Sequence, residues 1–118
     1  MASVKETNLT FGPLSQRSIT DLIVIHHVGN IDRDVSADEI HRWYLANGWA
    51  GIGYHFVVRK DGMIERGRPR DVIGAHAQGF NSRSIGINIV GDFEQGTPNS
   101  AQIESASMLI ADLSDIYG

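Results

Sequence analysis

The feature that most constrains the fold is an apolar run ending in two histidines, Asp21–His27. A short and mostly β-branched apolar run predicts a strand buried on both faces, as found in the middle of a sheet. Because successive side chains of a strand point to opposite faces, His26 and His27 cannot both face one pocket. An imidazole in such a position can serve as a metal ligand or a general base. For an isolated histidine pair, a purely structural role is the simpler interpretation.

Length and charge exclude several classes of protein. The chain has 118 residues, enough for one domain with its own core. A formal net charge of −4 argues against nucleic acid as a partner, because such proteins usually need a basic face. No apolar stretch is long enough to span a bilayer, and the first ten residues lack the pattern of a secretory signal. We therefore expect neither nucleic acid nor a membrane as a partner.

The first half of the chain divides into an arm and the start of a domain. Residues 1–20 are polar and predict an irregular N-terminal arm, so the domain is expected to cover 21–118. Ser36 followed three residues later by Glu39 is typical of a capping box. Together with Gly48, which fits the position after a helix end, it predicts a helix over about 37–47.

The second half predicts three further strands and a helix. Strands are expected at 54–59 and 63–66, joined by a hairpin turn at Asp61-Gly62, and a fourth at 84–90. The irregular stretch 68–82 is long for a compact domain, which favours a functional loop.

The last helix is expected to begin with Thr97 as N-cap and Pro98 in the first helical position. The resulting order, β-α-β-β-β-α, predicts an α/β (α+β) fold with a mixed central β-sheet flanked by helices.

Several motifs, in this order and spacing, resemble the type 2 N-acetylmuramoyl-L-alanine amidases. This family includes bacteriophage lysozyme-amidases (endolysins), bacterial autolysins and animal peptidoglycan recognition proteins. The resemblance covers nearly the whole chain from about Asp21 onward. The matching segments are Ile23–His27, Ile40–Trp43, Gly48–Phe56, Asp61-Gly62, Arg66–Pro69, Gly74–His76, Asn81-Ser82, Ser84–Ile87 and Gly91–Phe93.

The resemblance implies a zinc hydrolase that cuts the amide between N-acetylmuramic acid and the L-alanine of the stem peptide. In such enzymes zinc lowers the pKa of a bound water and polarises the carbonyl group. By the resemblance, His26 is the first zinc ligand, and Tyr54 is a catalytic residue beside the metal. Trp49, His76 and Asn81 are then substrate-binding residues in the groove that holds peptidoglycan or muropeptides.

Four other residues are expected to have supporting roles. By strand alternation, His27 should point away from the metal and pack in the interior, and His55 should lie opposite Tyr54. His41, in the first helix, is expected to be structural. Tyr44 stands where close bacterial relatives often have a second histidine, and we expect it to be a tolerated change.

The resemblance also predicts an incomplete site and fold. The remaining zinc ligands of the family, a histidine and a cysteine or aspartate, follow the last helix, whereas this sequence ends at Gly118. The domain is therefore expected to be truncated at its C-terminus, with an uncovered sheet edge. Such an edge predicts a homodimer or a partner that pairs along it.

Three functions remain open at this point. The first is a peptidoglycan amidase of bacterial or prophage origin, located in the cytoplasm or released to the cell wall by a holin-type or other route. The second is a non-catalytic peptidoglycan-binding or regulatory module without the full metal site. The third is a remnant in which the motifs only maintain the core, although Tyr54, His76 and Asn81 are polar residues that a core does not need.

Overall fold

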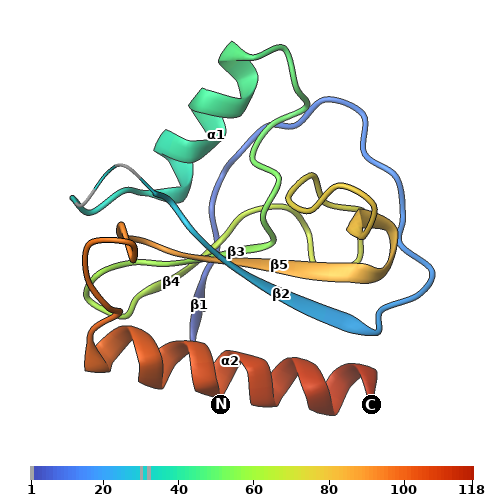
Figure 1. Cartoon of the computed structure of the whole chain (residues 1–118). Coiled ribbons are helices and arrows are strands. Elements are labelled where there is room, and N and C mark those ends of the chain that lie inside the picture. The colour runs from blue at the N-terminus through green and yellow to red at the C-terminus, as the bar shows by residue number, and fades with distance from the viewer. Residues whose placement is uncertain (1, 30, 32) are drawn as a thin grey trace.

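A mixed five-stranded sheet lies between two helices that cover its opposite faces (Figure 1). The computed structural model describes residues 2–29, 31 and 33–118. The helices are α1 (Ala37–Ala46) and α2 (Ser100–Tyr117), and a short 3-10 helix η1 covers Asn81–Arg83. The sheet order is β1-β4-β3-β5-β2, with β1 at Val4–Lys5, β4 at Ile64–Arg66, β3 at Phe56–Val58, β5 at Ser84–Ile89 and β2 at Leu22–His27.

Strand β5 lies between β3 and the edge strand β2, and every one of its residues is buried. It pairs in parallel with both β2 and β3, whereas β3 and β4 form the expected antiparallel hairpin. The prediction that 21–27 is a central strand is wrong, because β2 lies at the edge of the sheet. Its apolar run is partly exposed there, with Leu22 at 36% and Ile25 at 46%. Within the described residues, the outer side of β2 has no neighbouring strand, so the expected uncovered edge is present.

The N-terminal arm contributes to the fold more than the sequence indicated. Val4 and Lys5 pair in parallel with Ile64 and Glu65, which makes β1 the other edge of the sheet. Further along, Gln16 forms an isolated bridge with Val72. The arm therefore joins the sheet at one end and reaches the loop after β4 at the other.

Helix α1 agrees with the sequence except at its cap. Ser36 accepts a hydrogen bond from the backbone N–H of Glu39 at 3.1 Å, as a capping box requires. The Glu39 carboxylate, however, pairs with Arg33 instead of returning to the cap, so the predicted box is half formed. After Asn47, Gly48 has φ of +80°, which ends the helix as expected.

Helix α2 begins later than predicted. Its N-cap is Asn99, whose side chain accepts from the N–H of Gln102 at 2.9 Å while Gln102 returns a bond to the cap. The prediction of Thr97 and Pro98 at the helix start is therefore wrong. A complete capping box at Asn99 outweighs the preference of proline for the first turn.

Removal of this cap should weaken the domain measurably. We expect Asn99→Ala to lower the free energy of unfolding by about 1 kcal/mol, because the backbone N–H of Gln102 loses its acceptor and the carbonyl of Lys60 loses the Asn99 amide donor. Thr97→Ala, two residues before the helix cap, is the matched control and should change it by less than about 0.5 kcal/mol. Urea unfolding of both variants measures the difference. Equal effects would show that the helix starts at Thr97.

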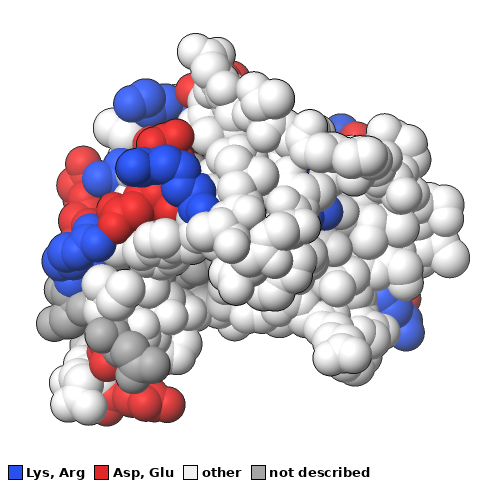
Figure 2. All heavy atoms as spheres, turned by 90° about the horizontal axis from the view of Figure 1, so that it is seen from above, with Lys and Arg blue, Asp and Glu red and all other residues white. Residues whose placement is uncertain are grey.

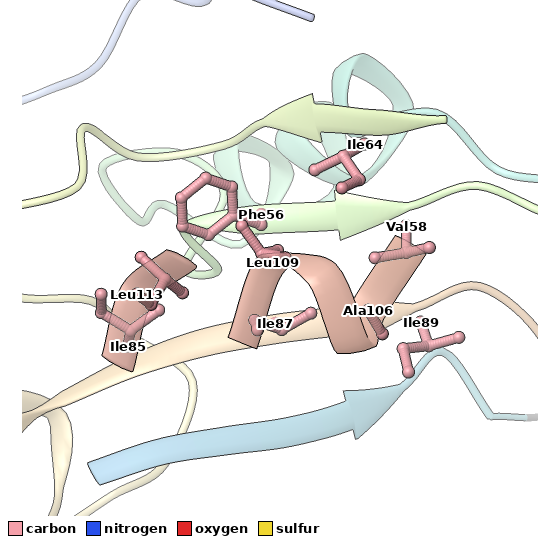
Figure 3. Close-up of a cluster of buried hydrophobic side chains, with 9 residues drawn as sticks. All are labelled: Phe56, Val58, Ile64, Ile85, Ile87, Ile89, Ala106, Leu109 and Leu113. Carbon is pink, nitrogen blue, oxygen red and sulfur yellow. The ribbon is translucent and has the colours of Figure 1, made fainter. Parts of the chain in front are cut away.

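Most of the core lies between α2 and the sheet (Figure 3). The alternate residues Ile85, Ile87 and Ile89 of β5 face this helix, and its side chains Leu109 and Leu113 pack on them. A smaller cluster under α1 includes Ile40 and Val57. No helix in the described part of the chain is long and apolar enough to cross a membrane.

Candidate functional site

The two histidines of β2 point to opposite faces, as alternation predicts. His26 is in register with Asn88 of β5, on the face of the sheet opposite α2. His27 lies on the other face, where its Nδ1 accepts a hydrogen bond from the N–H of Phe93 at 3.1 Å. The His27 ring also stacks on the Phe93 ring, with centroids 5.8 Å apart. His27 is therefore a packing residue.

The structure brings His26, Tyr54 and His76 together, although they are far apart in sequence. The ring centroid of His26 lies 5.2 Å from that of Tyr54 and 5.1 Å from that of His76. Nε2 of His26 is 3.0 Å from Nδ1 of His76, which is hydrogen-bonding distance. We refer to these three residues as the histidine–tyrosine cluster.

The loop 68–82 places His76 over the sheet. Asn81 accepts hydrogen bonds from the backbone N–H groups of His76 and Ala77, both at 2.9 Å. Beneath the imidazole lies Gly86 of β5, where an added Cβ would come within 2.4 Å of Cγ of His76. The missing side chain at Gly86 thus makes the room that the His76 ring fills.

Beside the cluster the surface is hollowed. The hollow has a volume of about 350 Å³ and is lined by Tyr44, Trp49, Ala75, His76, Gln78 and Asn81. Trp49 is 56% exposed, and its ring packs edge-on against Tyr44 with centroids 5.1 Å apart. All three residues predicted to bind substrate therefore line one hollow next to His26.

Burial keeps the two phenols of the site protonated. It raises the pKa of Tyr44, whose hydroxyl donates to the carbonyl of Ala75 at 3.1 Å. Burial also raises the pKa of Tyr54, although side-chain hydrogen bonding to Tyr44 and Asn88 opposes the change. Near pH 7 the Tyr54 hydroxyl is therefore a hydrogen-bond donor.

Burial also keeps the histidines of the cluster neutral. It lowers the pKa of His76 to about 3, and the nearby His55 and His26 lower it further. The pKa of His26 is lowered by burial first and then by the charge of His27. Each ring therefore carries one proton and one free lone pair near pH 7.

Asn88, which sequence reasoning missed, lies at the base of the site. Its side chain is 1% exposed, and its amide oxygen has no hydrogen-bond partner among the described residues. It is in register with His26 and contributes to the pKa of Tyr54. No sequence motif marks it, because a single polar residue in a strand can face either side of the sheet.

Two other histidines are structural. His41 accepts from the N–H of Ile52 and donates to the carbonyl of Thr10, both at 3.0 Å, as the sequence suggested. His55 is fully buried, where it accepts from the N–H of Gly86 at 3.0 Å and donates to Val72 at 2.8 Å. The His41 ring ties helix α1 to the N-terminal arm and to the segment before β3, and the His55 ring ties the loop to β5.

Two buried guanidinium groups, which no sequence motif marks, hold the loop from beneath. Arg68 donates to the carbonyls of Ile52 and Ile73, at 2.8 and 2.9 Å. Arg17 donates to the carbonyls of Arg70 and Val72, both at 2.7 Å. In sequence, arginines in a glycine-rich loop resemble solvated residues, and only their burial shows that they satisfy loop carbonyls.

The buried His55 should make stability depend on pH. Its folded pKa is about 4 because of burial, whereas the ordinary value is 6.5. Between pH 6.5 and pH 4, the His55 imidazole is protonated in the unfolded chain but stays neutral in the folded chain. The free energy of unfolding is therefore highest above pH 6.5 and decreases as the pH falls toward 4. We expect His55 alone to contribute about 1.4 kcal/mol per pH unit in this window.

Urea unfolding at several pH values tests this dependence. His55→Gln keeps an amide donor but cannot titrate, so its unfolding free energy should fall less steeply with decreasing pH. The comparison of slopes remains valid if the variant is less stable throughout. Equal slopes for the two proteins would contradict the assignment.

The described residues do not by themselves fit a zinc centre. Zinc hydrolases use three protein ligands and keep one position open. Within the described residues, no three His, Cys, Asp or Glu side chains come close enough together to hold a metal ion. His26 offers one imidazole, and a complete centre would need donors beyond those that the structure describes.

Charged side chains gather at one side of the face seen from above, and much of the remaining face is uncharged (Figure 2). Several of these charges are paired near the start of α1, where Arg33 contacts Glu39 and Arg42 contacts Asp38. Arg59 of the neighbouring hairpin contacts Asp34 at 2.7 Å. No ion pair in the described part of the chain involves the histidine–tyrosine cluster.

The fold is that of the N-acetylmuramoyl-L-alanine amidases. The sequence profile of that family, Amidase_2, matches residues 15–118, and the chain belongs to this family. The family and the mixed-sheet fold expected from the sequence are thereby confirmed.

Proteins of bacteriophages and of Drosophila are similar in sequence to this chain. The endolysin of Klebsiella phage KP32 is 35% identical over 109 residues, which cover 87% of this chain and 72% of that protein. The endolysin of Escherichia phage T7 is 36% identical over 94 residues, covering 79% and 62%. Peptidoglycan-recognition protein SC2 of Drosophila melanogaster is 41% identical over 96 residues, covering 75% and 52%. The chain thus spans only part of each relative's length.

Solved structures show the same architecture. The N-acetylmuramoyl-L-alanine amidase LysC from Clostridium intestinale superposes with a TM-score of 0.94 at 37% identity, over 99% of this chain and 78% of that chain. A second match, at a TM-score of 0.84 and 26% identity, is the ectodomain complex of peptidoglycan recognition proteins LCa and LCx with tracheal cytotoxin, covering 97% of this chain and 76% of that chain.

Proposed function

We propose that this chain is the catalytic part of a peptidoglycan amidase that hydrolyses the bond between N-acetylmuramic acid and L-alanine. The observation that carries the proposal is the histidine–tyrosine cluster beside a hollow lined by Trp49 and Asn81. A site of this kind offers a neutral imidazole and a phenol donor next to a surface that could hold a muropeptide. Membership of the amidase family supports the same reaction.

In this proposal Tyr54 donates a hydrogen bond to the oxyanion that forms when the amide carbonyl is attacked. A donor aimed at developing charge in a partly buried site contributes more than it would in water. The raised pKa of Tyr54 keeps its proton in place for this role. Trp49, His76 and Asn81 would contact the sugar or the stem peptide in the hollow.

We further propose zinc as the cofactor, with His26 as one of its ligands. The support is the family resemblance and the neutral imidazole of His26, whose Nδ1 no described residue engages. Since the described residues supply no set of three ligands, the proposal requires additional donors.

Release of stem peptides from purified cell wall tests the proposed reaction. We would incubate peptidoglycan and zinc with this chain and, where the reading frame continues, with the longer product. Peptides with a new N-terminal alanine are expected from at least one of the two. If neither releases peptide, the enzymatic proposal is wrong.

A second candidate function is muropeptide binding without cleavage, and the hollow beside His76 supports it. A module that binds muropeptides without cutting them needs the hollow but no metal centre. Binding that is lost in Asn81→Ala or Trp49→Ala, with no peptide released by any form, would establish this alternative. The absence of muropeptide binding would exclude it.

The open edge of β2 leads us to propose pairing with a second copy of the chain. Leu22 and Ile25 expose apolar surface along this edge, and the sheet ends there among the described residues. We expect light scattering to give the mass of a dimer, and Ile25→Lys to shift it to that of a monomer. A monomeric parent chain would contradict the pairing.

A further inference from the structure

A chain of hydrogen bonds leads from the backbone of the loop to the imidazole of His26. The hydroxyl of Ser84 donates to the carbonyl of Phe80 at 2.7 Å. The same Oγ lies 3.3 Å from Nε2 of His76, and Nδ1 of His76 lies 3.0 Å from Nε2 of His26. The hydrogen-bonded chain therefore runs from the carbonyl of Phe80 through the hydroxyl of Ser84 to the imidazole of His76, and from there to the imidazole of His26.

The position of each proton follows from the carbonyl. A carbonyl oxygen can only accept, so the single hydroxyl proton of Ser84 is used at Phe80. Toward His76 the Oγ can then only accept, so Nε2 of His76 must carry the ring proton. Because a neutral imidazole has one ring proton, Nδ1 of His76 is bare and accepts from Nε2 of His26. The remaining nitrogen, Nδ1 of His26, is left with a free lone pair.

Two observations support this assignment. Among the described residues, no carboxylate forms a hydrogen bond or an ion pair with either ring, so nothing there favours a second proton on His26 or His76. The carbonyl of Phe80 also accepts from the backbone N–H of Arg83 at 3.1 Å, which fixes it in the turn that faces Ser84. No described residue forms a hydrogen bond with Nδ1 of His26.

The surroundings of His76 are built to hold it in place. Asn81 binds the backbone of His76, and Gly86 leaves the space for its ring. Ser84 itself is fully buried at the start of β5, where it cannot exchange its partners with solvent. These contacts hold the His76 ring in one orientation against His26 and Ser84.

We infer that His76 and Ser84 are positioning residues that fix the tautomer of His26 with the proton on Nε2 and the lone pair of Nδ1 free. The use of that lone pair, as a metal ligand or an acceptor for a bound molecule, rests on the proposed function. The tautomer itself does not. A metal-binding histidine is commonly set in this way by the partner of its other nitrogen.

Nitrogen NMR of the whole chain, labelled with ¹⁵N and kept free of metal by a chelator, tests the inference. Two-bond ¹H–¹⁵N correlations distinguish protonated from bare ring nitrogens. For His26 and His76 alike, we expect Nε2 to be protonated and Nδ1 to be bare. Ser84→Ala should shift His76, and with it His26, toward a mixture of tautomers. Ser82→Ala, an exposed serine two residues away, is the matched control and should leave both unchanged.

A proton on Nδ1 of His26 in the parent chain would overturn the inference, as would unchanged spectra of both rings in Ser84→Ala. If Ser84→Ala does not fold, the tautomers of the parent chain alone decide. The test is separate from that of the proposed function. An inactive chain with the expected tautomer leaves the inference intact, and an active chain with the opposite tautomer removes only the inference.

Discussion

Tyr54→Phe should lower the rate of stem-peptide release by about 100- to 1,000-fold, the usual effect of removing one oxyanion donor. The phenol lies next to His26, with ring centroids 5.2 Å apart, and burial raises its pKa so that it keeps its proton. Loss of the hydroxyl leaves the ring and its packing in place. We therefore expect kcat to fall while the unfolding free energy changes little. Chromatography of released peptides, in the form that shows activity, measures the rate.

Tyr44→Phe is the matched control for this experiment. It removes a hydroxyl from the neighbouring phenol, whose ring centroid lies 6.1 Å from that of Tyr54. That hydroxyl donates to the carbonyl of Ala75 and so links helix α1 to the loop 68–82. We expect a loss of less than about tenfold, since a typical hydrogen bond contributes about 1 kcal/mol. Similar losses in both variants would mean that Tyr54 has no special role in the reaction.

Phe56→Ala should destabilise the domain by about 3–5 kcal/mol, enough to unfold many domains of this size. Phe56 is 2% exposed at the centre of the cluster under α2, and the guanidinium of Arg66 lies over its ring at 4.9 Å. Truncation would leave a cavity that the isoleucines of β5 cannot fill. Urea unfolding monitored by tryptophan fluorescence gives the change in free energy.

The control for the core substitution is another phenylalanine. Phe80 is 50% exposed in the loop before β5, so Phe80→Ala removes a ring of the same size from the surface. We expect a change of less than about 0.5 kcal/mol. A small effect at Phe56 would mean that the packing between α2 and the sheet does not carry the stability of the fold.

The elements of the fold could be predicted from local pattern, but the place of each strand could not. The apolar run before His26 correctly predicted a strand, but that strand lies at the edge of the sheet, and the strand beside it, fully buried, is β5. The sequence of β5 has a glycine and an asparagine among its isoleucines, which suggests a half-buried strand. Those two residues face the site, where the His76 ring covers Gly86. Strand order depends on long-range pairing, which local periodicity does not encode.

For the candidate site, too, motifs identified individual residues but not all of the contacts between them. His26 and Tyr54 were found through motifs, and the structure places their rings together. The contact between His26 and His76 could not be foreseen, because it depends on how the loop 68–82 folds back over the sheet. Asn81 was expected to bind substrate, but its oxygen is occupied by two backbone N–H groups. We therefore propose that Asn81 contacts substrate through its side-chain amide nitrogen only.

The central claim is that the histidine–tyrosine cluster is a site for cleavage of the muramoyl–alanine bond. Mass spectrometry of a defined muropeptide, after incubation with the protein and zinc, tests it most directly. The account predicts a sugar with a free lactyl carboxylate and a peptide with a free alanine amine, and no such products from His26→Ala. Cleavage between sugars, or an unchanged yield from His26→Ala, would contradict it.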